Sequence, residues 1–322
     1  RPGHLELTAI DPRKLICDAL FANGTNQIIW HGMPFNQVGD TSNYFYTTCQ
    51  LSTSEDCNLS GDVLTDFNRY MTLVSSYMRR GNNYSDIAVY MPLEDAWMGG
   101  AYPEDVHKQM NWLWGQYEMR YIQTPEQLKG RQPLWINAHF LQSATFKNNT
   151  LYCGNAQFKS LYVDVDYMEL TALKTIIGLA KQGLPVYFQH DTQEPGKVKH
   201  ADDYAAALAE LRQIASVISD ASLLPNMPLI EGDDLPDFWV RQEGDCYYIF
   251  FANPLTQTIK YPLDYCYAFT DKGSTCPIRI NHHGRTDQLT LQFRPTESLL
   301  IEVTKDGVKT IDTGYLPPKL RS

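Results

Sequence analysis

The sequence predicts a mixed fold, α/β plus β, in which two α/β parts are followed by an all-β tail. Apolar strand patterns alternate with amphipathic helix patterns up to residue 224, which is typical of parallel sheets with helical crossovers. Beyond that residue, short alternating runs are separated by turn residues. The length of 322 residues also exceeds the usual span of one hydrophobic core. We therefore predict domains at residues 1–122, 123–224 and 225–322, the second of them an α/β domain that is flavodoxin-like or amidotransferase-like.

The first part begins with a helix over 13–22, which Asn23-Gly24 ends because glycine accepts the left-handed cap. A short apolar strand is expected over 27–30. The elements that follow are a helix over 63–78, a buried strand over 86–91 and a helix over 103–121. Strand, helix and strand in this order indicate parallel pairing.

The second part repeats this alternation, and the tail abandons it. Strands are predicted over 161–165 and 185–188, and helices over 168–182 and 201–219. The tail carries six strand patterns with no helix between them, which favours an antiparallel β-sandwich. These runs are 239–241, 247–252, 258–261, 278–280, 289–293 and 299–303.

Composition and motifs exclude several classes of protein. The 27 basic and 37 acidic residues give a net charge of −10, and no Lys/Arg cluster is present. We therefore expect neither a nucleic acid nor a membrane as partner. No HExxH, GxSxG, GxGxxG or phosphate-loop motif occurs, which disfavours zincins, serine hydrolases, Rossmann dehydrogenases and P-loop proteins. Four Asn-x-Ser/Thr sequons occur at Asn23, Asn58, Asn83 and Asn148, a pattern that is common by chance.

The candidate site residues follow the ends of predicted strands, where parallel α/β proteins bind ligands. His31 comes directly after the strand over 27–30, and Glu94, Asp95 and Trp97 come after the strand over 86–91. Carboxylates accept hydrogen bonds from hydroxyl groups and an indole covers the apolar face of a sugar ring. Tyr46 is a candidate for the rim of the same pocket. The alternative is structural, with Asp95 capping the next helix, Trp97 in the core and His31 bonded to a loop.

A family resemblance is carried by the segment Asp18–Gly32, which has the sequence DALFANGTNQIIWHG. It resembles a segment of glycoside hydrolase family 106, the α-L-rhamnosidases. Shorter matches follow in the same order along the chain, at Phe45-Tyr46, Phe67-Asn68 with Tyr70, Ser85–Trp97, Tyr187-Phe188, Trp239–Arg241 and Ile249–Asn253. The chain departs from the family at Ala138, where the family pattern has an aspartate.

The resemblance implies that residues 1–122 form the later part of a (β/α)₈ barrel. It also implies a rhamnose-containing glycan as substrate, removal of a terminal deoxy-sugar by an inverting two-carboxylate mechanism, and a bound calcium ion. In that register the acid and base fall before Arg1, on an N-terminal catalytic segment or a partner chain, so no catalytic or metal-binding residue is assigned here. We expect a secreted or periplasmic protein. The alternative hypothesis is a non-catalytic carbohydrate-binding protein or an inactive glycosidase relative.

Overall fold

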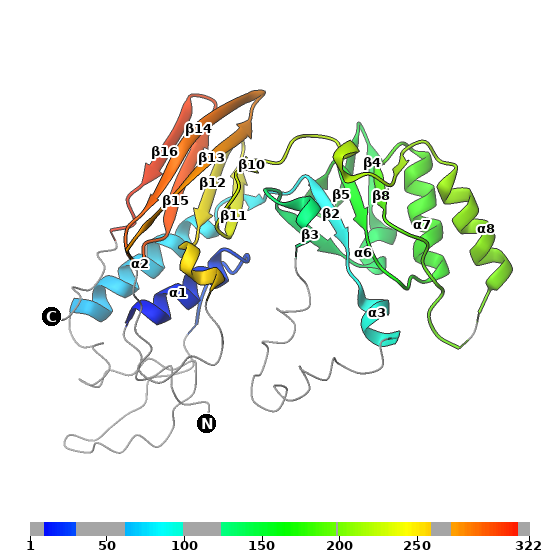
Figure 1. Cartoon of the computed structure of the whole chain (residues 1–322), viewed down its shortest axis with the longest axis horizontal. Coiled ribbons are helices and arrows are strands. Elements are labelled where there is room, and N and C mark those ends of the chain that lie inside the picture. The colour runs from blue at the N-terminus through cyan, green and yellow to red at the C-terminus, as the bar shows by residue number, and fades with distance from the viewer. Residues whose placement is uncertain (1–9, 30–61, 99–123, 198, 259–271, 315–322) are drawn as a thin grey trace, which may run out of the picture. The chain divides into compact units, whose positions relative to one another are not determined.

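A computed structural model describes residues 10–29, 62–98, 124–197, 199–258 and 272–314 (Figure 1). The chain divides into two compact units, residues 1–82 with 230–322 and residues 83–229. This division differs from the three consecutive domains expected from the sequence. The helices near the amino end share a core with the carboxyl-terminal strands, and the strand at 87–90 belongs to the sheet of the second unit.

The first unit packs two helices against an antiparallel sheet. The helices are α1 (Ile10–Phe21) and α2 (Asp62–Met78). The sheet has the order β1 (Asn82–Asn83), β11 (Phe238–Glu243), β12 (Cys246–Phe251), β15 (Leu299–Thr304) and β16 (Gly307–Ile311). Phe21 and Phe67 from the helices meet Phe250 and Leu300 from the sheet in one apolar cluster. Burial of this cluster explains why segments so distant in sequence form one unit.

A second antiparallel sheet in this unit consists of β10 (Ile230–Glu231), β13 (Ser274–His282) and β14 (Arg285–Phe293). Buried and exposed residues alternate along much of β13, as in a strand with one face on the core. The antiparallel tail predicted from the sequence is therefore observed, with a short helix η5 (Pro254–Gln257) after β12. Most of the strand predicted at 258–261 lies outside the described residues.

A buried polar network joins α1, α2 and the segment that leads into β15. Lys14 and Asp18 form an ion pair with both side chains fully buried. The Lys14 ammonium donates to the Thr296 carbonyl at 2.9 Å. Tyr70 and Ser298 donate their hydroxyls to Asp18 at 2.7 Å and 2.6 Å. Each partner of the buried pair is thus satisfied by further hydrogen bonds, which burial of charge requires.

The expected barrel segment is not confirmed. The described part of residues 1–122 contains two strands, at 82–83 and 87–90, which belong to different sheets, and no sheet formed by described residues is closed. Residues 27–29, predicted as a strand, have no regular structure, and Ile29 is 81% exposed. The predicted end of α1 is confirmed, because Gly24 has a φ of 92° and lies against the Trp239 indole. The helix expected over 103–121 lies outside the described residues.

The second unit is built on a parallel sheet. Its order is β3 (Pro133–Ile136), β2 (Ile87–Tyr90), β7 (Ser160–Val163), β8 (Val186–Phe188) and β9 (Val217–Ile218). All four neighbouring pairs are parallel. Counted along the chain this is the order 2-1-3-4-5 of flavodoxin-like sheets, so the strand order reverses between β2 and β7.

Helices cover one face of this sheet (Figure 1). They are α6 (Ala138–Ser143), α7 (Leu170–Lys181) and α8 (Ala201–Arg212), and they pack on residues such as Leu161 and Val186. The opposite face, with Val89 and Tyr162, contacts the region of η3 (Glu126–Leu128) and η4 (Ala221–Leu223). A three-stranded sheet of β4 (Thr145–Lys147), β5 (Thr150–Cys153) and β6 (Ala156–Phe158) completes the unit.

Candidate functional site

The candidate site is the carboxyl edge of the parallel sheet, where β2 and β7 end side by side. In open α/β sheets of this order, ligands bind in the crevice at the strand pair where the order reverses. Beyond β2 the chain passes Met91-Pro92 and enters α3 (Leu93–Met98). Three of the residues predicted for the site, Glu94, Asp95 and Trp97, lie on this short helix.

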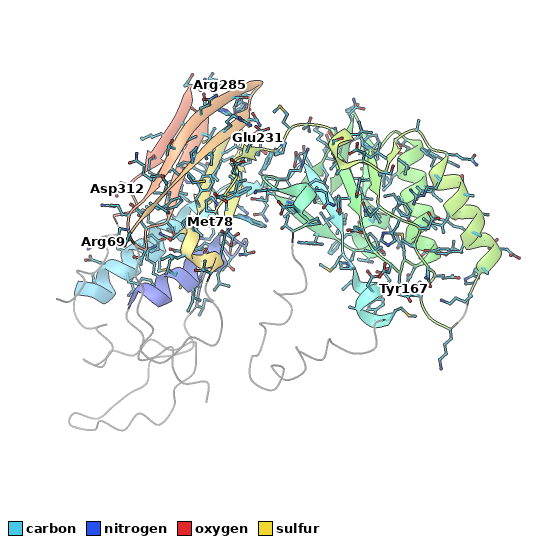
Figure 2. The ribbon with its side chains drawn as sticks, viewed as in Figure 1. Arg69, Met78, Tyr167, Glu231, Arg285 and Asp312 are labelled. Atoms are coloured by element: carbon cyan, nitrogen blue, oxygen red, sulfur yellow. The ribbon has the colours of Figure 1, made fainter. Side chains whose placement is uncertain are left out.

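Asp95 holds the loop that follows β7. Its carboxylate accepts a hydrogen bond from the Tyr167 backbone N–H at 2.6 Å and another from the Asp166 backbone N–H at 3.1 Å. Tyr167 lies beside α3 (Figure 2). Burial raises the pKa of the Asp95 carboxyl, and the two backbone donors act against that rise. The sequence left open that Asp95 caps its own helix. It instead has a structural role at a distance, because it anchors the loop after β7.

Glu94 faces the protein interior. Its side chain is buried, and the Tyr90 hydroxyl donates to its carboxylate at 2.7 Å. Burial raises the pKa of Glu94 above the usual range, and the neighbouring carboxylates of Glu169 and Asp95 add to that effect. The Tyr90 side chain is also buried, with its pKa raised for the same reason. The Glu94 carboxylate is therefore bonded to a buried hydroxyl inside the protein and does not face solvent.

Four described residues at this edge with accessible side chains are Trp97, Asp164, Asp166 and His190. The Trp97 side chain is 65% exposed, so it is not in the core. His190, which follows β8, lies between two carboxylates, with 3.0 Å from its Nε2 to Asp166 and 3.6 Å from its Nδ1 to Asp164. All three of these polar side chains reach solvent. An exposed indole and a polar triad of this kind can contact a polyhydroxylated ligand through stacking and hydrogen bonds.

Asp164, Asp166 and His190 were not among the site residues predicted from the sequence. The signal was present, because His190 follows the predicted strand over 185–188 just as the other candidates follow theirs. His31 and Tyr46, by contrast, lie outside the described residues, and their place in the site stays a prediction.

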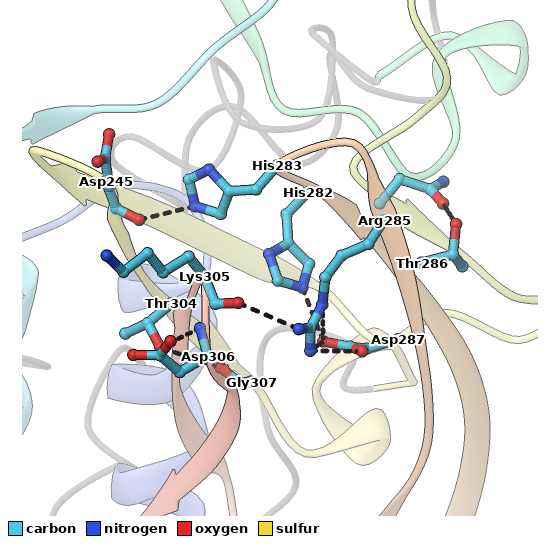
Figure 3. Close-up of polar contacts among 11 residues, drawn as sticks. Asp245, His282, His283, Arg285, Thr286, Asp287, Thr304, Lys305, Asp306 and Gly307 are labelled. Carbon is cyan, nitrogen blue, oxygen red and sulfur yellow. Dashed lines mark hydrogen bonds and ion pairs between the residues drawn. The ribbon is translucent and has the colours of Figure 1, made fainter.

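A second polar cluster lies at the β13–β14 hairpin of the first unit (Figure 3). His282 lies beside the hairpin turn, yet its side chain is fully buried. Its Nε2 contacts the Asp287 carboxylate at 2.8 Å. Arg285 donates to the same carboxylate, and these bonds lower the pKa of Asp287. His283 is exposed and bonds the Asp245 carbonyl through Nε2. The cluster fastens the hairpin tip.

No set of three or more His, Cys, Asp or Glu side chains among the described residues has an arrangement that could hold a metal ion. The calcium ion implied by the family resemblance thus stays a prediction. None of the described helices combines the length and apolar character needed to cross a membrane.

Comparison with known proteins gives a structural likeness only. No family model matches the chain, and no curated protein matches its sequence. The chain is similar to Gan42B, a GH42 β-galactosidase from G. stearothermophilus, with a TM-score of 0.46, 8% identity and coverage of 95% of this chain. A catalytic mutant of Gan42B gives the same TM-score and identity over 94% of this chain. The chain spans about half of these structures, 51% of their length.

Proposed function

We propose that the chain is part of a glycoside hydrolase-like protein and that it contacts carbohydrate at the carboxyl edge of its parallel sheet. The observation that carries the proposal is the exposed Trp97 indole on α3, the helix whose Asp95 bonds the loop bearing Asp166. An apolar surface and accessible hydrogen-bonding groups thus lie at one edge, at the strand pair where ligands bind in such sheets.

The chemistry of this edge suits a sugar ring. Trp97 would cover the ring face that carries C–H groups. Asp164 and Asp166 would accept hydrogen bonds from hydroxyls, and His190 can donate or accept through Nδ1, whose 3.6 Å separation from Asp164 is longer than a hydrogen bond. Following the sequence resemblance, we propose a terminal deoxy-sugar such as L-rhamnose, whose C5 methyl group adds apolar surface for the indole. His31, Tyr46 and a calcium ion remain part of this proposal on the strength of the sequence alone.

The described acids of α3 are poor candidates for the catalytic pair. An inverting glycosidase needs two carboxyl groups about 6.5–9.5 Å apart with space for a water molecule between them. Glu94 is buried against Tyr90, and Asp95 is bonded to two backbone amides. We propose that the general acid and base are residues other than Glu94 and Asp95. The same observation favours the second candidate, in which this part of the protein binds carbohydrate without cleaving it.

Isothermal titration of methyl α-L-rhamnoside into the purified chain tests the proposal. Trp97→Ala should abolish binding, because it removes the stacking surface of a side chain that is 65% exposed. Met227→Ala is the matched control: Met227 is also exposed, at 60%, and it follows Asn226, which bonds Arg131 ahead of β3. It therefore lies near the opposite edge of the same sheet, and its loss should leave binding unchanged.

Equal binding by Trp97→Ala and the parent chain would refute a site at this edge. Release of sugar from an aryl α-L-rhamnoside separates the two candidates. Hydrolysis by the purified chain supports the enzyme, whereas binding without hydrolysis supports the carbohydrate-binding protein.

A further inference from the structure

The hairpin between β4 and β5 carries an Asn-x-Thr sequon at its tip. β4 ends at Lys147 and β5 begins at Thr150, and these two residues face each other in the ladder. Asn148 and Asn149 therefore form a two-residue turn, with φ of 51° and 55°. Both values lie in the left-handed region that this turn requires and that asparagine tolerates. Both turn residues are exposed.

Asn148 differs from the other two sequon asparagines that the structure describes. The Asn23 side-chain amide donates to the Ala19 carbonyl at 2.8 Å, where it caps the end of α1. Asn83 belongs to β1, a strand of the five-stranded sheet in the first unit. No described residue forms a hydrogen bond with the Asn148 side chain, so a substituent on its amide nitrogen would displace no contact seen here.

We propose that Asn148 is an N-glycosylation site. The donor is an oligosaccharide attached to a polyprenyl pyrophosphate. The Asn148 amide nitrogen forms a bond to the sugar C1 and loses one proton, and the C1–oxygen bond to the pyrophosphate breaks, so that the polyprenyl pyrophosphate leaves with the electron pair. The proposal goes beyond carbohydrate binding and requires that the chain enters a secretory pathway.

The fold also sets when this reaction takes place. The sequon hydroxyl belongs to Thr150, which is only 4% exposed. That hydroxyl donates to the Asn148 carbonyl at 3.3 Å and accepts from the Lys159 ammonium at 2.6 Å. A transferase that recognises the threonine hydroxyl cannot reach it in the folded hairpin. Transfer therefore precedes folding, and the exposed Asn148 lets the finished hairpin carry the glycan.

The test is translation of the full chain, fused to a cleavable signal peptide, with glycosylation-competent microsomes. In the protease-protected product, the peptide that contains Asn148 should carry a glycan that a peptide N-glycosidase removes, leaving aspartate at that position. Asn148→Gln should lose one glycan from the protein. Asn149→Gln is the matched control, because Leu151 two residues later means that Asn149 is not itself a sequon asparagine.

A protected chain whose Asn148 peptide carries no glycan, or an Asn148→Gln variant with as many glycans as the parent, would overturn the proposal. A second experiment tests whether glycan transfer precedes folding. The transferase and its lipid-linked donor are added to purified folded chain, and separately to chain that was unfolded in urea and diluted immediately before the reaction. Modification of the unfolded chain alone is expected. Equal rates on both forms would contradict the argument from Thr150.

Discussion

Asp95→Ala should destabilise the second unit, because among the described residues its carboxylate is the side-chain acceptor for two backbone N–H groups, those of Asp166 and Tyr167. A hydrogen bond to a charged group contributes about 1.5–3 kcal/mol, so two such bonds set an upper bound of about 3–6 kcal/mol. Two effects reduce the loss below this bound. Water can hydrogen-bond the Asp166 amide once the carboxylate is removed. Burial of the ionised Asp95 carboxylate also costs free energy in the parent protein, as its raised pKa indicates. We therefore expect a loss of about 2–3 kcal/mol in the free energy of unfolding.

The measurement is urea unfolding followed by circular dichroism, together with hydrogen exchange at the Asp166 and Tyr167 amides. For a domain of this size the loss corresponds to a fall in Tm of roughly 4–12 °C. Exchange at both amides should accelerate, because each loses its acceptor. Asp166→Asn is the matched control, since its exposed carboxylate contacts His190 and takes no part in these bonds. A loss below about 0.5 kcal/mol for Asp95→Ala, or unchanged exchange at both amides, would refute the anchoring role and return Asp95 to the candidates for ligand binding.

Two further predictions concern buried charge. Glu94→Gln should keep the hydrogen bond from Tyr90 and remove the titration of the carboxyl group. Because the pKa of Glu94 is raised in the folded state, the carboxyl group stabilises the parent protein fully below its unfolded-state pKa. That stabilisation is lost as pH rises through the folded-state pKa. Urea unfolding should thus show the variant gaining on the parent between pH 4 and pH 8, and a constant difference would contradict this. Lys14→Met should cost about 3–5 kcal/mol, because it leaves Asp18 buried without its cation. Lys14→Met combined with Asp18→Asn removes the unpaired charge and keeps an acceptor for Tyr70 and Ser298, so it should recover part of that loss. Equal losses in the single and double variants would contradict the assignment.

The sequence predicted local elements better than their partners. Periodicity placed the helix at 168–182 and the strand at 185–188 within two residues of α7 and β8. It extended the next helix to residue 219, whereas α8 ends at Arg212 and Val217–Ile218 form β9. Apolar residues satisfy a helical pattern and a short strand equally, and the parallel pairing with Val186 decides between them.

The division of the chain into two units was also not predictable from local patterns. Tertiary contacts, which no local pattern contains, assign the strand at 87–90 to a sheet with partners at 133–136 and 160–163. In the candidate site, the residue types and the strand end were predictable, since acids and an indole follow the strand. The separate roles of the two acids were not predictable. Glu94 is buried against Tyr90, and Asp95 accepts from backbone amides seventy-one and seventy-two residues away, contacts that depend on the pairing of β2 and β7.

The bonds of Asp95 also limit where a ligand can lie at this edge. They join α3 to the loop after β7 across the strand pair where the order reverses, so the space directly above β2 and β7 is bridged by protein. In the proposed site, a ligand would therefore contact the groups of α3 and of the loops after β7 and β8 that reach solvent, which are Trp97, Asp166 and His190. If the proposed site binds a rhamnoside, Asp95 acts on it through the position of Asp166, so Asp95→Ala should weaken rhamnoside binding only in proportion to the loosening of that loop.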